Sequence, residues 1–149
     1  MDSVSVIRVT NESPLWAELI AYADQCSWAA GGHLAYLMRE HQFTGWESVF
    51  AALDHDRIAG YCTLMNTDYY PENRYSPWIS SIFVGESYRG RRISGQMIRA
   101  AEDYARSIGF TRAYIPSDMT GFYERYGYEK IDELVNYGGD TDHIFSRSI

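Results

Sequence analysis

The clearest hydrophobic pattern in the chain is an apolar run that passes through a polar turn into an amphipathic segment. Apolar residues dominate positions 79–84, which predicts a strand, and from Ile93 onward apolar side chains recur at helical spacing. Gly109 suits the left-handed position just past a helix C-terminus. We therefore expect a strand that feeds directly into a helix ending at Gly109.

The rest of the chain shows shorter elements of both kinds. We expect further strands at 4–9, 49–53, 58–65, 112–115, 128–135 and 143–149, helices at 14–26, 34–41 and 120–126, and a loop at 66–77. Ser13 is placed to cap the first helix, with Pro14 as its first residue. Gly31-Gly32 predicts a bend before the second helix, and Pro116 predicts the end of a strand.

Composition bounds the class of protein. With 149 residues, 46% of them hydrophobic, the chain suits one domain over residues 1–149 with a sizeable core. It has no apolar run long enough for a membrane span and no signal-peptide pattern at its start, so we expect a cytoplasmic protein without a membrane partner. Cys26 and Cys62 lack metal-ligand spacing, which predicts reduced core thiols and no metal site. The net charge of −7 argues against nucleic-acid binding and is compatible with a cationic partner.

The turn between the strand at 79–84 and the following helix has the features of an anion site. Free N–H groups and the dipole of a helix N-terminus attract negative charge, and glycine lets backbone approach a phosphate closely. Residues 86–112 hold six arginines against three carboxylates, although the whole chain is acidic. A solvated surface turn can have the same composition, so the order of the residues decides between the two.

That order matches a known motif. Val84, Tyr88-Arg89-Gly90, Ile93 and Ser94 resemble the acetyl-CoA pyrophosphate loop of the GNAT superfamily of N-acetyltransferases, a strand Val followed by Tyr-Arg-Gly-x-Gly-Ile-Gly/Ala. Arg92 stands where the family has its second glycine, and Ser94 stands where it has Gly or Ala. The resemblance implies that acetyl-CoA is bound by Ile82, Phe83, Val84, Arg89, Gly90, Arg91, Arg92, Ile93, Ser94 and Gly95.

A second motif follows at the distance usual in this family. The segment from Gly121 to Tyr128 resembles Gly-Leu/Phe-Tyr-Glu-Lys-x-Gly-Phe, although Ser117-Asp118 stands where many members carry an Asn. Taken alone, Tyr123 would be a helix tyrosine that packs into the core. In the family, the matching tyrosine donates a proton to the leaving thiolate, which suits a phenol with a pKa of about 10. The resemblance therefore implies that Tyr123 is a general acid.

The resemblance also implies an architecture and a reaction. The fold would be mixed α/β, with a central, mostly antiparallel sheet of about seven strands, splayed between the fourth and fifth and flanked by four helices. Pantetheine would pair with the exposed edge of the fourth strand through Ile82 and Val84. A backbone N–H near Phe83 or Val84 would polarise the thioester carbonyl while the amine attacks directly in a ternary complex.

The residue that deprotonates the amine is left open by the sequence. A free alkylamine is mostly protonated at neutral pH, so a carboxylate or a water chain must take its proton. Candidate bases are Asp68 and Glu72 on the loop at 66–77 and Asp118 after the fifth strand, each of which could equally be a solvated loop acid. His33 is a further candidate.

Aromatic residues border the acceptor side of this fold. They are Trp28, Trp46, Tyr69, Tyr70, Tyr75 and Trp78. Aromatic faces beside carboxylates attract ammonium groups, so we expect the partner to be a small-molecule or peptide primary amine. The sequence leaves open which amine this is and whether the C-terminal strands pair across a homodimer.

Two other classes of function remain as alternatives. The first is a non-catalytic acyl-CoA-binding sensor with a degenerate form of this fold. The altered loop at Arg92 and Ser94 and the absence of a carboxylate from the strand at 78–84 favour it. The second, a structural protein without a nucleotide, would require both motifs to be accidental.

Overall fold

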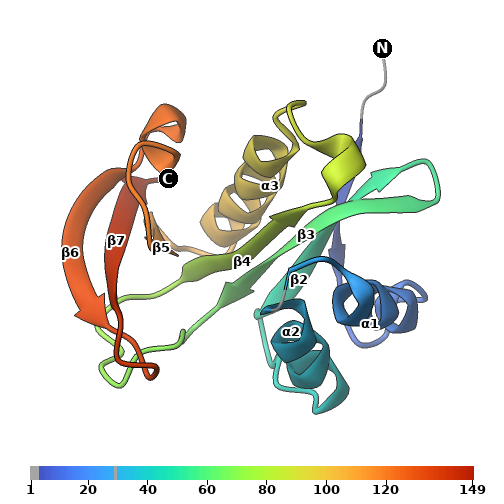
Figure 1. Ribbon diagram of the computed structural model, residues 1–149, viewed down its shortest axis with the longest axis horizontal. Helices are drawn as coiled ribbons and strands as arrows, with labels where there is room; N and C mark the ends of the chain where they lie inside the picture. Colours follow the sequence, from blue (N-terminus) through green and yellow to red (C-terminus); the bar gives the residue numbers. More distant parts are fainter. Residues whose placement is uncertain (1–3, 29) are drawn as a thin grey trace.

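A seven-stranded sheet forms the centre of the computed structural model, which describes residues 4–28 and 30–149 (Figure 1). The strands are β1 (Ser5–Val9), β2 (Ser48–Asp54), β3 (Arg57–Met65), β4 (Trp78–Val84), β5 (Arg112–Ser117), β6 (Glu129–Val135) and β7 (Thr141–Ser148). Their order in the sheet is β1-β2-β3-β4-β5-β7-β6, and all neighbours are antiparallel except β4 and β5. The predicted mixed α/β fold with a mostly antiparallel sheet is confirmed.

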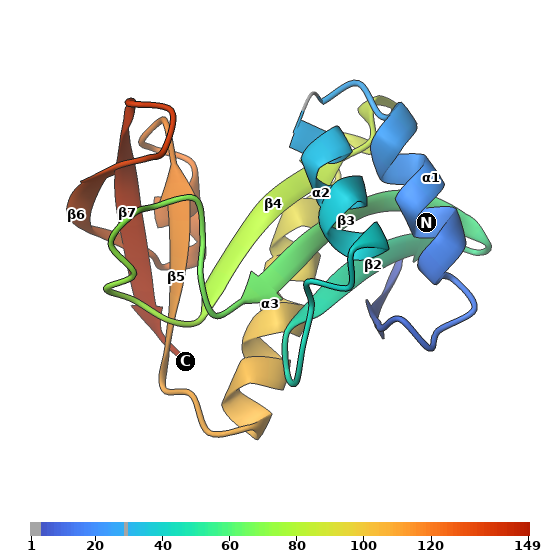
Figure 2. The same ribbon diagram turned by 90° about the horizontal axis from the view of Figure 1, so that it is seen from below.

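Helices cover both faces of the first half of the sheet. Helices α1 (Trp16–Gln25) and α2 (Ala30–Arg39) lie on one face, and α3 (Ile93–Ser107) lies on the other (Figure 2). Strand β2 contributes side chains to the packing on both faces of the sheet, because successive side chains of a strand point to opposite faces. Val49 and Ala51 pack with α1 and α2, whereas Phe50 and Ala52 pack with α3.

The predicted fourth helix is only a single turn. Within the described residues the chain forms three α-helices and two short 3₁₀ turns, η1 (Glu86–Tyr88) and η2 (Tyr123–Tyr126). Gly121 at φ 94° and Gly127 at φ 92° bound η2 on either side. Because both residues adopt left-handed backbone, a longer helix over 120–126 is excluded, and the expectation of four flanking helices is wrong.

Strands β4 and β5 meet at one end and diverge from it. The only paired position between them is Trp78 with Tyr114, and Figure 2 shows the two strands separating toward their C-terminal ends. A small apolar cluster that includes Trp78, Leu134 and Ile144 fills the closed end. The predicted splay between the fourth and fifth strands is confirmed, and it leaves one side of β4 without a neighbouring strand.

The start of the first helix differs from the prediction. Helix α1 begins at Trp16 rather than Pro14, and Ser13 does not cap it. The Ser13 hydroxyl instead accepts a hydrogen bond from the Thr10 N–H at 2.9 Å. The Ser13 hydroxyl thus bonds within the turn before α1, and the helix begins two residues later than predicted.

Two predicted breakers lie inside regular elements. Gly31 falls within α2 rather than before it. A Cβ at this position would lie 2.2 Å from the carbonyl oxygen of Ala23 in α1, so glycine allows the two helices to approach closely. Pro116 does not end β5 but stays in register with Ile144 of β7. At that point β5 has a neighbour on one side only, and such a strand tolerates a residue without an N–H.

Candidate active site

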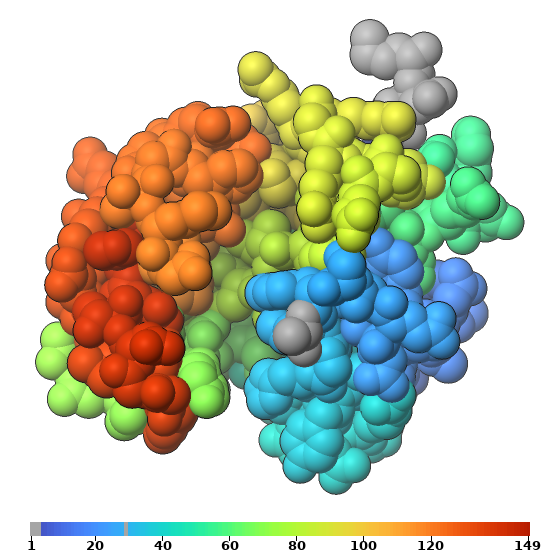
Figure 3. All heavy atoms as spheres, in the orientation of Figure 1, coloured from blue at the N-terminus to red at the C-terminus, as the bar shows by residue number. Residues whose placement is uncertain are grey.

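The diverging ends of β4 and β5 border a cavity of about 910 Å³. Its walls come from the start of α2, the loop after β3, the middle of β4, the loop after β5, η2 and the start of β7. Figure 3 shows this face of the molecule hollowed between the orange and red C-terminal segments and the blue helices. Trp28 and His33 both line this cavity. Among the described residues, no helix is both long and apolar enough to cross a bilayer.

Asp68 is the candidate base with the most distinctive environment. The Ser80 hydroxyl of β4 donates to its carboxylate, as does the Tyr69 backbone N–H at 2.7 Å. Burial is the largest cause raising the pKa of Asp68 above its ordinary value, and the negative charge of Asp142 adds to it. A carboxylate whose pKa is raised accepts a proton from an ammonium group more readily than a solvated one does.

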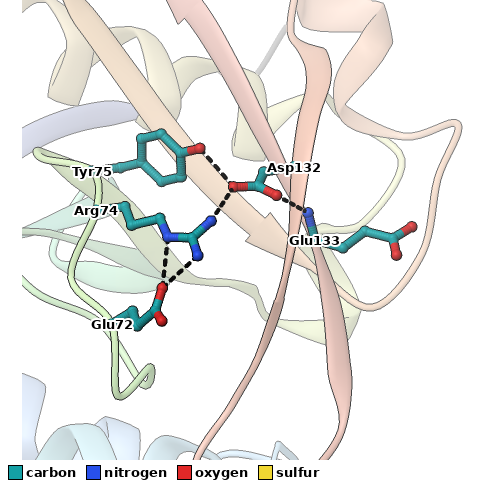
Figure 4. A network of polar contacts seen from close by, with 5 residues as sticks. All are labelled: Glu72, Arg74, Tyr75, Asp132 and Glu133. Atoms are coloured by element: carbon teal, nitrogen blue, oxygen red, sulfur yellow. Dashed lines mark hydrogen bonds and ion pairs between the residues drawn. The ribbon is translucent and has the colours of Figure 1, made fainter.

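The other candidate bases occupy different positions. Asp118 and His33 line the same cavity as Asp68, but Glu72 is not among the lining residues. Glu72 accepts a hydrogen bond from Nε of Arg74 at 2.6 Å, and Arg74 also contacts Asp132 of β6 at 3.2 Å (Figure 4). Glu72 thus belongs to a surface network that ties the loop at 66–77 to β6.

Tyr123 lies where η2 meets the cavity. Its ring packs against Phe122 and Phe145, with centroids 4.9 and 6.2 Å away, and the residue lines the cavity. Burial is the main cause that raises the pKa of Tyr123 to about 12. The phenol therefore keeps its proton at neutral pH, which is the form that a general acid requires.

Strand β4 presents backbone groups to the splayed side. The Gly85 N–H donates to the Ala59 carbonyl at 2.8 Å. Because an antiparallel ladder alternates, the N–H and C=O of the preceding residue, Val84, point away from β3. A register shift lies earlier in β4, between Ser80 and Phe83. There Ser81 adopts φ 50° and Ile82 lines the cavity. The backbone N–H and C=O of Val84 thus point to the splayed side of the sheet, and their contact with pantetheine stays a prediction.

Arg89 and Phe83 have contacts of their own. Nε of Arg89 donates to the Val84 carbonyl at 3.0 Å, and its guanidinium lies 5.8 Å from the centroid of the Phe83 ring. Phe83 itself is buried and stacks on Tyr61 at 5.3 Å. A ligand that pairs with the Val84 carbonyl must therefore displace Arg89. By the same alternation the backbone N–H and C=O of Phe83 point toward Tyr61 of β3, so the expectation that Phe83 binds the cofactor finds no support in this geometry.

The turn before α3 leaves the first N–H groups of the helix without a side-chain cap. Gly90 has φ 83° and Arg92 has φ 59°, and both values lie in the left-handed region that favours glycine. This explains why the family motif has a second glycine where this chain has Arg92. Ile93 is buried and offers only backbone. Beside this turn lies a second cavity of about 1070 Å³. Its arginines are Arg91, Arg92, Arg99, Arg125 and Arg147.

The first turn of α3 is attached to η2. The hydroxyl oxygens of Ser94 and Tyr126 lie 3.2 Å apart. A Cβ on Gly95 would lie 2.8 Å from the Tyr126 ring, so this position requires glycine. Ser94, predicted to bind the cofactor, thus directs its hydroxyl to Tyr126 and joins the arginine-rich turn to the segment that carries Tyr123.

Sequence reasoning missed two carboxylates of the cavity next to β4. Asp142 lies at the start of β7, where the Tyr70 hydroxyl donates to it at 2.8 Å, and Glu47 lies just before β2. No motif or spacing in the sequence connects these residues. Together with Asp68 and Asp118 they give four carboxylates, and the described part of the lining has neither lysine nor arginine.

The splayed sheet and the two cavities define an acetyltransferase type of architecture. The sequence matches the acetyltransferase (GNAT) family over residues 14–128, and the chain belongs to this family. A curated relative, the acetyltransferase Atu2258 of Agrobacterium fabrum (strain C58 / ATCC 33970), is 38% identical over 60 residues. That match covers 38% of this chain and 44% of the relative's length.

Solved structures show the same fold at low sequence identity. An aminoglycoside 6'-acetyltransferase type Ii is 20% identical with a TM-score of 0.74, over 97% of this chain and 96% of its own. A GNAT family acetyltransferase from Elizabethkingia anophelis with acetyl-CoA bound is 16% identical, with a TM-score of 0.66 over the whole of both chains. At these identities the likeness shows the fold.

Proposed function

We propose that this protein is an N-acetyltransferase that moves the acetyl group of acetyl-CoA to a primary amine of a small molecule or peptide. The observation that carries the proposal is the shared cavity of Asp68 and Tyr123 beside the unpaired side of β4. Family membership supports acetyl transfer. The choice of an amine is supported by a lining that, over the residues the structure describes, has four carboxylates and no lysine or arginine, since such a lining attracts cations.

The residues beside α3 fit a cofactor that carries several phosphates. Arg91, Arg92 and the uncapped N–H groups at the start of α3 would hold the pyrophosphate of acetyl-CoA. The C=O of Val84 would pair with its pantetheine arm once Arg89 turns away, and the Val84 N–H would stay free for the thioester carbonyl. Bound in this way, acetyl-CoA supplies the thioester for the reaction.

The chain's own groups then handle the protons. Asp68 accepts a proton from the substrate ammonium, so that the nitrogen can attack the acetyl carbon. The Val84 N–H polarises the carbonyl oxygen while the new C–N bond forms. As the C–S bond breaks, Tyr123 donates its proton to the leaving sulfur. The attacking nitrogen loses its second proton as the amide forms, and that proton restores the Tyr123 phenol.

Steady-state release of free thiol tests this assignment. Tyr123→Phe should lower kcat by about 100-fold, the scale of a lost general acid, while calorimetry shows unchanged acetyl-CoA affinity. Tyr36→Phe, which changes a tyrosine that is 56% exposed on α2, is the matched control and should keep full turnover.

Two results would contradict the proposal. Unchanged turnover of Tyr123→Phe would remove this residue from the mechanism. Tight binding of acetyl-CoA by the wild type without amine-dependent thiol release would favour the alternative of an acyl-CoA-binding sensor.

A further inference from the structure

One carboxylate of the acceptor cavity has no part in the proposed proton transfers. Asp142 accepts two hydrogen bonds at Oδ2, from the Tyr70 hydroxyl at 2.8 Å and from Nδ2 of Asn136 at 3.1 Å. Tyr70 is 5% exposed and packs against Trp78 with centroids 5.5 Å apart, so this donor is fixed by the core. The carboxylate of Asp142 is therefore oriented before any ligand arrives.

The second oxygen of this carboxylate is available to a ligand. Within residues 4–28 and 30–149, no side chain or backbone group forms a hydrogen bond or ion pair with Oδ1 of Asp142. The residue nevertheless lines the cavity, so a bound molecule can reach it. An oriented carboxylate with one unused oxygen is a ready acceptor for a charged N–H donor.

The charge of the cavity lining exceeds what one ammonium group can balance. The acidic lining residues are Glu47, Asp68, Asp118 and Asp142, and His33 is the lone basic side chain among the lining residues described. Asp142 also acts on Asp68, because its negative charge is one of the causes of the raised pKa there. A second positive group near Asp142 would relieve this repulsion while Asp68 deals with the reacting nitrogen.

We propose that the acceptor is a diamine or polyamine, and that Asp142 is the specificity-determining residue that binds its second ammonium group. The inference rests on the proposed function, because it assigns the substrate class of the same cavity. Two aromatic rings add to the attraction at the edge of the cavity. Tyr69 and Tyr137 lie edge to face at 5.5 Å, and both line the cavity that Asp142 enters.

The decisive comparison uses two amines that differ by one ammonium group. At saturating acetyl-CoA, kcat/KM for 1,4-diaminobutane should exceed that for n-butylamine by roughly 10- to 100-fold, the scale of one charge-assisted hydrogen bond. Asp142→Asn should remove most of this preference, because it should raise KM for the diamine far more than KM for the monoamine. Any effect through Asp68, whose pKa the Asp142 charge helps to raise, should fall on both amines alike. Amine-dependent thiol release measures both.

Asp140→Asn is the matched control. It removes the same charge from the neighbouring turn, outside the residues that line the cavity, and should preserve the preference for the diamine. A second variant, Tyr70→Phe, keeps the charge of Asp142 but removes one of its two hydrogen-bond donors, and should weaken the preference in part.

The outcomes separate the two proposals. Equal use of both amines by the wild type, or an equal loss for both amines in Asp142→Asn, would overturn the diamine inference alone. Release of no thiol with either amine, from folded protein that binds acetyl-CoA, would overturn the proposed function and the inference with it.

Discussion

Asp68 is held in an environment that opposes its charge. Burial and the negative charge of Asp142 raise its pKa, against the effect of hydrogen bonds from Ser80 and Tyr69. Since the folded state binds this proton more tightly than the unfolded state does, the resulting stability is fully present below the unfolded pKa. It is lost as the pH rises through the raised folded pKa. Above that folded pKa, the ionised carboxylate therefore costs stability.

This cost can be measured with one substitution. Asp68→Asn should raise the Tm at pH 8 and lose that advantage as the pH falls through the raised folded pKa, because the wild-type carboxyl then takes up its proton. Acetyl transfer by the same variant should fall. Asp56→Asn, in the exposed turn between β2 and β3, controls for a general change in net charge. A lower Tm of Asp68→Asn at pH 8 would show that the ionised group stabilises the fold instead.

The two proton-handling groups also set the pH dependence of the rate. As the pH rises, kcat/KM should increase while Asp68 loses its proton, because only the carboxylate form can accept a proton from the substrate ammonium. The pKa of Tyr123, raised to about 12, keeps this phenol protonated well above neutral pH. We therefore expect no falling limb below about pH 10. A decline in kcat/KM between pH 7 and 9 would contradict Tyr123 as the acid.

Arg92 combines backbone strain with a useful charge. An L-residue in the left-handed region costs about 1–2 kcal/mol, and Arg92 has φ 59°. Arg92→Gly should therefore be more stable than Arg92→Ala by about 1 kcal/mol in urea unfolding. Both variants should lose acetyl-CoA affinity to the same extent, because both lose the charge. Equal stability of the two variants would show that the turn relaxes without strain.

At the scale of elements, the attachment of η2 to α3 joins the two predicted motifs. The Ser94 and Tyr126 hydroxyls form the polar part of this contact, and the Tyr126 ring on Gly95 forms the apolar part. In a double-mutant cycle of Ser94→Ala and Tyr126→Phe, the coupling in unfolding free energy should be about 0.5–1 kcal/mol. Additive losses would mean that the two hydroxyls act independently.

The sequence predicts what local patterns determine. The order of strands and helices and the fifteen-residue helix α3 follow from periodicity and glycine positions. The splay of β4 from β5 came only from the family resemblance. The role of Ser94 and the place of Asp142 could not be predicted, because they depend on contacts between residues 32 and 72 positions apart. Glu72 was a candidate base by position alone, and only the fold shows it paired with Arg74.

At the scale of the whole molecule, opposite charges are separated between two cavities. Beside α3, five arginines outnumber Glu102 and Asp103, and between β4 and β7 the lining is acidic, in a chain of net charge −7. Such a division suits a polyanionic donor on one side and a cationic acceptor on the other. Strand β6 lies at the edge of the sheet with Ile131 and Val135 exposed, and pairing across a homodimer stays a prediction.

The most direct measurement of the central claim identifies the product. Purified protein is incubated with acetyl-CoA and either 1,4-diaminobutane or n-butylamine, and free thiol and acetylated product are quantified together, the latter by mass spectrometry. The account predicts amine-dependent thiol release matched by an equal amount of N-acetylated amine. Acetylation of a neutral alcohol with no amide product, or binding of acetyl-CoA without turnover, would contradict it.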